Sequence, residues 1–149
     1  MREIKFRAMT KPPEDFADYH FTSTMVYGTA LFVDPVNTWL CFHDPIQALA
    51  FDMTKHIVKP ETVGQFIGLC DGNNKEIYEG DILDFNMQDY NGSDHLYRLP
   101  VIFAGACFGC AGNDKYGDPV FIMLDEIIAN DDEAMVIGNV HQNPELLNG

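Results

Sequence analysis

Cys107 and Cys110 form a Cys-Phe-Gly-Cys pair, a spacing used by zinc sites and by thiol redox sites. A structural zinc site has four ligands, usually as two close pairs, and the best second pair here is Cys41 with His43. A redox pair needs a helix start that favours the thiolate, whereas the glycines around Phe108 indicate a loop. We therefore interpret the thiols as inert. A metal or thiol site at Cys107 and Cys110 stays as an alternative.

The other titratable residues match no catalytic motif. The histidines are scattered without ligand spacing, at His20, His43, His56, His95 and His141. Glu79, Asp81 and Asp84 lie close together in the chain, but turn capping explains an Asp that follows Gly80. The sequence contains no phosphate-binding loop, nucleophile elbow, or kinase or deaminase signature. It therefore predicts no catalytic residue and no cofactor.

The stretch from residue 63 to residue 83 alternates short apolar runs with turn-forming residues. Asn and Gly tolerate positive φ, so the cluster at 71–74 predicts a hairpin turn. Gly80 can adopt the left-handed conformation, and the Asp81 carboxylate can accept backbone N–H groups that the turn leaves free. The predicted structural turn residues are Gly68, Asp71, Asn73, Asn74, Gly80 and Asp81.

Further short strands are expected on both sides of this stretch. Residues 2–8 alternate, which places Ile4, Phe6 and Ala8 on one face of a strand and Arg7 on the other. Residues 24–33 and 38–42 form a hairpin around the turn at 34–37, while 44–51 fits either one helical turn or a strand. The remaining expectations are strands at 96–103, 120–124 and 135–140, a glycine-rich loop or bulged segment between the first two, and a short helix beginning within 125–133.

This pattern indicates a mainly β fold, with an α+β fold left open. We expect an N-terminal β-hairpin lobe over residues 1–62 and a small barrel-like C-terminal lobe over residues 63–149, together one continuous unit. A polar, proline-containing segment at 59–62 marks the boundary.

Composition narrows the classes of function. The formal net charge of −14 repels phosphate backbones, so direct nucleic-acid binding is not expected. No apolar run approaches the roughly 18 residues of a membrane span, and the first residues lack an apolar secretory core. These features predict a cytoplasmic protein without a membrane partner.

Four aromatic residues in the N-terminal part predict an interface: Tyr27, Trp39, Phe42 and Phe51. A small lobe buries a limited share of its surface, so some of these rings are expected to pack on a second subunit. The sequence therefore favours a homo-oligomer.

Three blocks of the chain resemble the YopX family of phage and prophage proteins. They are the opening segment 2–8, the segment 59–82 with Gly-Gln-Phe, Gly-Leu and Lys-Glu-Ile-Tyr-Glu-Gly-Asp-Ile, and the closing segment 136–147. Two positions depart from the family pattern, since Asn74 stands where the family has Gly and Met9 where it has Trp. The resemblance implies a YopX-like fold in the cytoplasm of a bacterial host and implies no particular reaction.

Three hypotheses of function follow. The first is a phage- or prophage-encoded accessory protein that is non-enzymatic and acts by binding a host or phage protein and by self-association. The second is an acidic decoy or adaptor for a basic host protein, suggested by the net charge. The third is the metal or thiol site at Cys107 and Cys110.

Overall fold

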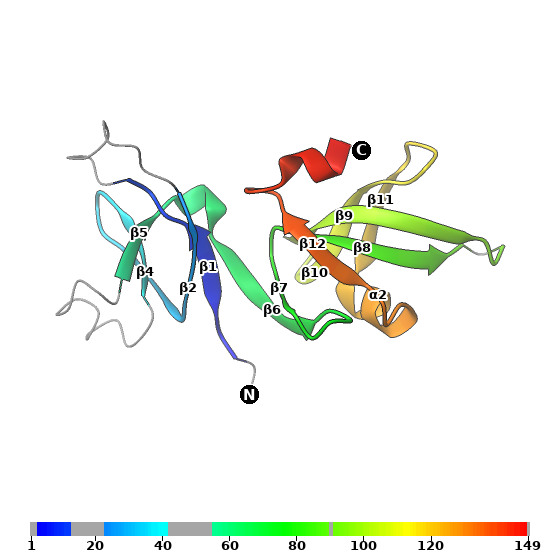
Figure 1. Ribbon diagram of the computed structural model, residues 1–149, viewed down its shortest axis with the longest axis horizontal. Coiled ribbons are helices and arrows are strands. Elements are labelled where there is room, and N and C mark those ends of the chain that lie inside the picture. Colours follow the sequence, from blue (N-terminus) through cyan, green and yellow to red (C-terminus); the bar gives the residue numbers. More distant parts are fainter. Residues whose placement is uncertain (1–2, 13–22, 42–54, 90, 149) are drawn as a thin grey trace. The chain divides into compact units, whose positions relative to one another are not determined.

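The computed structural model describes residues 3–12, 23–41, 55–89 and 91–148. Short antiparallel strands dominate these residues, so the predicted mainly β fold is confirmed (Figure 1). Two compact units divide the chain, Met1–Phe66 and Ile67–Gly149. The division into lobes at residue 62 stays a prediction. Among the described residues, no helix has the length and apolar character to cross a membrane.

The first unit contains two small sheets with the strand orders β2-β1-β6 and β3-β4-β5. Its elements are β1 (Phe6–Met9), β2 (Met25–Gly28), β3 (Ala30–Val33), β4 (Thr38–Cys41), β5 (Lys55–Val58), the 3-10 helix η3 (Pro60–Thr62) and the start of β6 (Gly64–Cys70). Ala8, Leu40 and Val58 are fully buried and form the centre of its core. The predicted segment 44–51 lies outside the described residues.

The single strand predicted at 24–33 is wrong, because it divides into β2 and β3 of different sheets. Gly28 causes the division: a Cβ at this residue would collide with the Cys41 carbonyl and the Leu40 side chain. The N–H of Thr29 then donates to the Cys41 carbonyl, 2.8 Å away. The chain changes sheet where only glycine fits.

The predicted alternation of residues 2–8 is also wrong at two positions. Ile4 is 57% exposed, whereas Arg7 is buried with 5% of its surface exposed. Arg7 lies on the middle strand of its sheet, opposite Tyr27 on one side and Gly64 on the other. Its place on the middle strand, between Tyr27 and Gly64, agrees with the small exposed fraction of Arg7.

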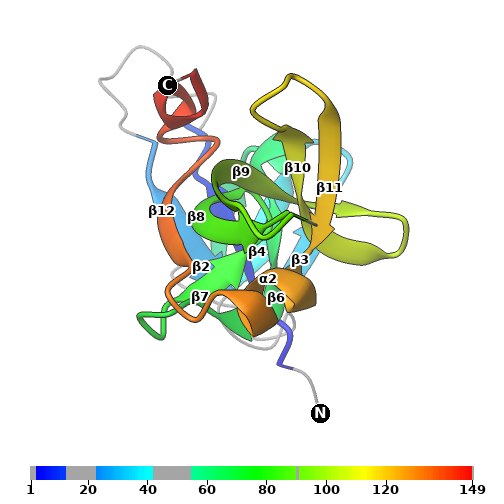
Figure 2. The same cartoon turned by 90° about the vertical axis from the view of Figure 1, so that its right-hand side faces the viewer.

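The second unit is built on a five-stranded sheet with the order β11-β10-β9-β8-β12, which curls into a half-barrel (Figure 2). Its elements are the end of β6, β7 (Glu76–Tyr78), β8 (Asp81–Gln88), β9 (Asp94–Ala104), β10 (Cys107–Asn113), β11 (Pro119–Met123), α2 (Leu124–Asn130), β12 (Met135–Asn139) and the 3-10 helix η4 (Pro144–Asn148). Leu124 and Ile127 of α2 are buried in one cluster with Leu83, Phe85 and Val101 of the sheet. We call this covered side the inner face and the opposite side the outer face.

Three hairpins of the second unit turn by the same five-residue design. In each, the Oδ1 atom of an aspartate accepts the N–H groups two and four residues later, at 2.8–3.0 Å; the aspartates are Asp71, Asp89 and Asp114. The third residue after the aspartate has positive φ and donates to the aspartate carbonyl; these residues are Asn74, Gly92 and Gly117. A short carboxylate thus closes each turn, which is why Asp-x-x-Gly or Asp-x-x-Asn occurs between strands.

Substitutions at the positive-φ position should change stability in opposite directions in two of these turns. We expect Gly117→Ala to destabilise the protein by about 1 kcal/mol, because φ is 86° and L-residues are strained there. No atom lies within 4 Å of a Cβ at this position, so backbone strain is the whole cost. Asn74→Gly, at φ 63°, should instead be neutral or stabilising by up to about 0.5 kcal/mol. Urea unfolding checks both variants, and a stabilised Gly117→Ala protein would contradict the assignment.

The glycine-rich loop or bulged segment predicted between residues 103 and 120 is wrong in its central part, since Cys107–Asn113 forms β10. Gly109 and Gly112 lie within this strand, where their missing side chains admit neighbours. A Cβ at Gly109 would meet the Phe121 ring, and one at Gly112 would overlap the Leu99 side chain. These glycines serve close packing between strands and do not interrupt the chain.

Candidate binding groove

An open groove of about 670 Å³ lies on the outer face of β9 and β10 in the second unit. Outward-pointing residues of the two strands line its floor, and Leu147 of η4 and residues of the β10–β11 turn also line it. The residues that line the groove through apolar side chains include Leu96, Pro100, Ala111 and Leu147. Leu96 is 68% and Leu147 is 39% exposed, so these apolar side chains are accessible to a partner.

A smaller cavity of about 180 Å³ adjoins the groove at the end where two of the aspartate turns meet. Its lining combines the β8–β9 turn, the β10–β11 turn and the start of β9, and it shares Tyr97, Asp114 and Lys115 with the larger groove. The two hairpin tips meet there because β8, β9, β10 and β11 are neighbours in chain order. We refer to the two cavities together as the β9–β10 groove.

The carboxylates around the β9–β10 groove are engaged with donors of the protein itself. Asp89 Oδ2 lies 2.9 Å from His95 Nε2, and this hydrogen bond, with the Ser93 and Asn91 amides, lowers the pKa of Asp89. Asp84 binds the Arg98 guanidinium through both oxygens, at 2.7 and 2.9 Å, and this contact raises the pKa of Arg98. Asp89 therefore closes the β8–β9 turn, and Asp84 on β8 holds the Arg98 side chain of the groove.

Lys115 is the accessible cation of the β9–β10 groove. Its Nζ atom lies 4.9 Å from the centre of the Tyr116 ring, and Tyr116 is 75% exposed. In the part of the chain that the structure describes, Lys115 forms no ion pair with a carboxylate. An exposed aromatic ring beside a cation is suited to recognition of a partner's side chains.

The composition of the β9–β10 groove is suited to binding. His95 and Asp89 form a pair of the kind that activates a nucleophile, but the described lining residues include no serine, threonine or cysteine. The apolar floor and the polar turn residues at one end instead match the composition of a protein-binding surface.

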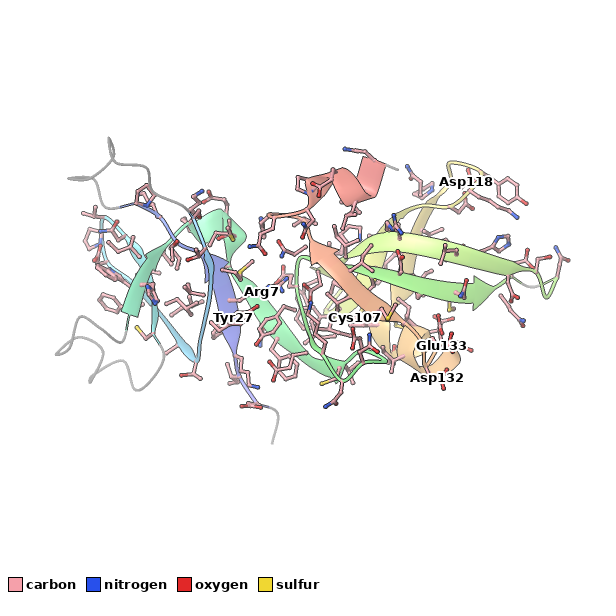
Figure 3. The ribbon with its side chains drawn as sticks, in the orientation of Figure 1. Arg7, Tyr27, Cys107, Asp118, Asp132 and Glu133 are labelled. Carbon is pink, nitrogen blue, oxygen red and sulfur yellow. The ribbon has the colours of Figure 1, made fainter. Side chains whose placement is uncertain are left out.

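The sequence-predicted thiol pair does not form a common site. β10 extends from Cys107 to Asn113, and side chains three residues apart on a strand point to opposite faces. Cys110 is buried on the inner face, where burial raises its pKa to about 12, whereas Cys107 is partly exposed and donates to the Ala104 carbonyl. The described residues contain no group of three or more metal-ligating side chains. Figure 3 labels Cys107 within the second unit.

Thiol labelling at pH 8 should divide the cysteines into two classes. Cys70 and Cys107 are partly exposed and should react fast, whereas Cys41 and Cys110 are buried and should react slowly. With a pKa of about 12, Cys110 is only about one part in 10⁴ thiolate at pH 8. A chromogenic thiol reagent should show two fast and two slow equivalents, and Cys107→Ser should remove one fast equivalent. Fast labelling of Cys110 would contradict its placement.

Five of the six predicted structural turn residues lie in or next to the β6–β7 and β7–β8 turns, whereas Gly68 lies within strand β6; none of the six lines the groove. Gly68 and Gly80 have φ of 90° and 89°, and Asp81 Oδ2 accepts the Tyr78 N–H at 2.8 Å. Asp71 also contacts a distant strand: its Oδ2 accepts the Val136 N–H at 2.9 Å.

The predicted interface residues are placed in part. Tyr27 is 50% exposed on β2, and the Nε1 of the half-buried Trp39 donates to Asp34 Oδ2 at 2.8 Å. Figure 3 labels Tyr27 in the first unit, together with Arg7. Phe42 and Phe51 lie outside the described residues.

Sequence reasoning missed Leu96, Lys115 and Tyr116 as groove residues. The sequence contained two signals. One is the apolar Leu96 between polar residues in the segment 94–98, and the other is the Asp-x-x-Gly pattern at 114–117. The distance between these segments in the chain hid their proximity in space.

Comparison with known proteins gives a family and similar solved structures. The family model described as YopX protein matches residues 22–148. The crystal structure of protein EF1440 from Enterococcus faecalis is similar at 24% sequence identity, covering 99% of each chain with a TM-score of 0.43. No curated protein matches the chain.

Proposed function

The chain belongs to the YopX protein family, and from this premise we propose that it is a non-enzymatic accessory protein that binds a partner protein and self-associates. As the resemblance implied, we place it among phage or prophage proteins in the cytoplasm of a bacterial host, with a host or phage protein as its partner. The membership itself names no reaction.

The observation that carries the binding proposal is the β9–β10 groove. Its apolar floor is accessible, its volume of about 670 Å³ is that of a site for several side chains, and its carboxylates are committed to turn caps. Exposed apolar side chains gathered in a groove cost solubility unless a partner covers them. Such a groove is suited to a short apolar segment of another protein.

A comparative pull-down tests this proposal. Immobilised wild-type protein and the Leu96→Asp variant are exposed to lysate of a bacterial host, and the retained proteins are quantified by mass spectrometry. Leu96 is 68% exposed, so the substitution should leave the fold intact while placing a charge in the groove floor. Val36→Asp is the matched control, because Val36 is also 68% exposed but lies in the first unit.

The expected result is at least one protein that wild type and Val36→Asp retain and Leu96→Asp loses by about tenfold or more. Retention should persist at about 0.5 M salt, because apolar contacts are not screened. Identical sets of retained proteins for all three baits would count against the groove.

A second candidate is an acidic decoy or adaptor for a basic host protein. The formal net charge of −14 favours it, since a strongly negative surface attracts basic partners and speeds their association. Here salt gives the opposite result: the partner should dissociate between about 0.1 and 0.5 M salt, as the Debye length shortens. A partner lost from Leu96→Asp but stable in salt would exclude this candidate for that partner.

A further inference from the structure

We propose that two copies of this chain pair antiparallel through the free edge of β11, which joins their five-stranded sheets into one. This inference rests on the self-association proposed above and names its surface. Within the described residues, β11 is the end strand of its sheet and has β10 as its neighbour. Figure 2 shows β10 and β11 side by side.

Hydrogen-bond alternation leaves the outer edge of β11 able to pair. The Asp114 N–H donates to the Asp118 carbonyl at 2.8 Å, which makes these residues a bonded pair. Bonded pairs recur at every second residue, so Val120 and Ile122 bond to β10. The N–H and C=O groups of Phe121 and the N–H of Met123 therefore point away from β10, whereas the Met123 carbonyl belongs to the N-cap of α2.

The opposite edge of the same sheet, strand β12, is protected against pairing with another strand. β12 carries an irregularity between Val136 and Gly138. Its Val136 N–H donates to Asp71 Oδ2 at 2.9 Å, and its Asn139 N–H donates to Asn143 Oδ1 at 3.3 Å. Bulges and covering groups are the usual protection of edge strands, and β11 has neither a register shift nor such a cover among the described hydrogen bonds.

The composition of β11 suits a second copy of this chain. Pro119–Met123 contains no charged residue, although the whole chain has a net charge of −14. Phe121 and Met123 are 41% and 46% exposed on the outer face. An uncharged, apolar edge is where two strongly acidic molecules can approach with least repulsion.

A two-fold axis at Phe121 gives a self-complementary register. Phe121 pairs with its own symmetry copy, and Met123 pairs with Pro119 of the second copy. The two Phe121 residues exchange two hydrogen bonds, and each Met123 N–H donates to the opposing Pro119 carbonyl. The missing N–H of Pro119 removes one bond on each side, so four backbone bonds remain.

Charges near the ends of β11 give the expected salt dependence. Asp118, labelled in Figure 3, precedes β11, and Asp125 follows it at the start of α2. In the proposed register these carboxylates of opposing copies approach each other and repel. Added salt should therefore strengthen the dimer, unlike complexes of an acidic protein with a basic one.

Sedimentation of the full chain tests the pairing. At about 100 μM the wild type should have the mass of a dimer and dissociate on dilution, as expected for a small interface. Phe121→Lys and Met123→Lys should each weaken the dimer by about tenfold or more, because a charge on an edge opposes pairing. Val36→Lys is the control: Val36 is 68% exposed and lies in the first unit, so this variant should remain dimeric.

Disulfide trapping identifies the register. Residues in a bonded antiparallel pair have Cα atoms about 5.5 Å apart, within the range of a disulfide. Oxidised Phe121→Cys should therefore form a covalent dimer that wild type and Val36→Cys, with the same native cysteines, do not form. A wild-type dimer that is unchanged by both lysine variants, without Phe121→Cys trapping, would overturn the β11 edge but leave self-association standing. A monomer at all concentrations would overturn both.

Discussion

Asp71→Ala is expected to lower the free energy of unfolding of the second unit by about 3 kcal/mol. The carboxylate accepts three backbone N–H groups, from Asn73 and Lys75 at 2.9 Å within the turn and from Val136 at 2.9 Å on β12. Asp71 is 8% exposed, so water replaces few of these bonds. Each hydrogen bond lost from a charged acceptor costs about 1 kcal/mol or more.

Asp114→Ala is the matched control for this prediction. Asp114 closes a turn of the same design through Tyr116 and Asp118, and both of its bonds are exposed. Its loss should cost about 1 kcal/mol. Urea unfolding is followed by circular dichroism, because Trp39 lies in the first unit and its fluorescence reports on that unit. Equal losses for both variants would show that the bond to Val136 contributes nothing.

The local parts of this fold could be predicted from the sequence because local chemistry determines them. The Asp-x-x-Asn turn at 71–74 closes through bonds between residues at most four apart, so its sequence pattern is enough. The same holds for the hairpin between β3 and β4, where Asp34 accepts the Val36 and Asn37 amides.

The errors arose where a distant neighbour decides the structure. Considered alone, Gly109 favours a turn. In the structure it is a strand residue, because it packs beside Phe121 of the neighbouring strand. The alternating pattern places Arg7 on the polar, exposed side of its strand. In the structure Arg7 lies opposite Gly64 and is buried. The bond from Val136 to Asp71 joins residues 65 apart and has no local signal.

The β9–β10 groove was unpredictable for a related reason. Its lining comes from β9, the β10–β11 turn and η4, which are separate in the chain. The Asp-x-x-Gly segments at 89–92 and 114–117 form turns through local bonds, but no local signal places these two turns at one end of a sheet. The apolar character of Leu96 was visible, whereas its exposure depends on which strands cover it.

Gly109→Ala is expected to destabilise the second unit by about 2–3 kcal/mol, although alanine is normally a mild change in a strand. The added Cβ would lie 2.5 Å from Cζ of Phe121 and 2.6 Å from the Ile122 carbonyl oxygen. Gly109 has no positive φ, so the cost is steric and must be met by a shift of β11 against β10. Gly105→Ala is the control, since its Cβ would meet no atom within 4 Å and its φ of 57° limits the cost to about 1 kcal/mol.

The double variant Gly109→Ala with Phe121→Ala separates the two groups that exclude a side chain at position 109. Phe121→Ala removes the ring but leaves the Ile122 carbonyl, so it should recover only part of the stability lost in Gly109→Ala. The measurements are made at about 1 μM, where the proposed dimer is dissociated. Full recovery would mean that the Phe121 ring alone excludes a side chain at 109. No loss in the single variant would mean that β10 and β11 are packed less closely at Gly109 than described.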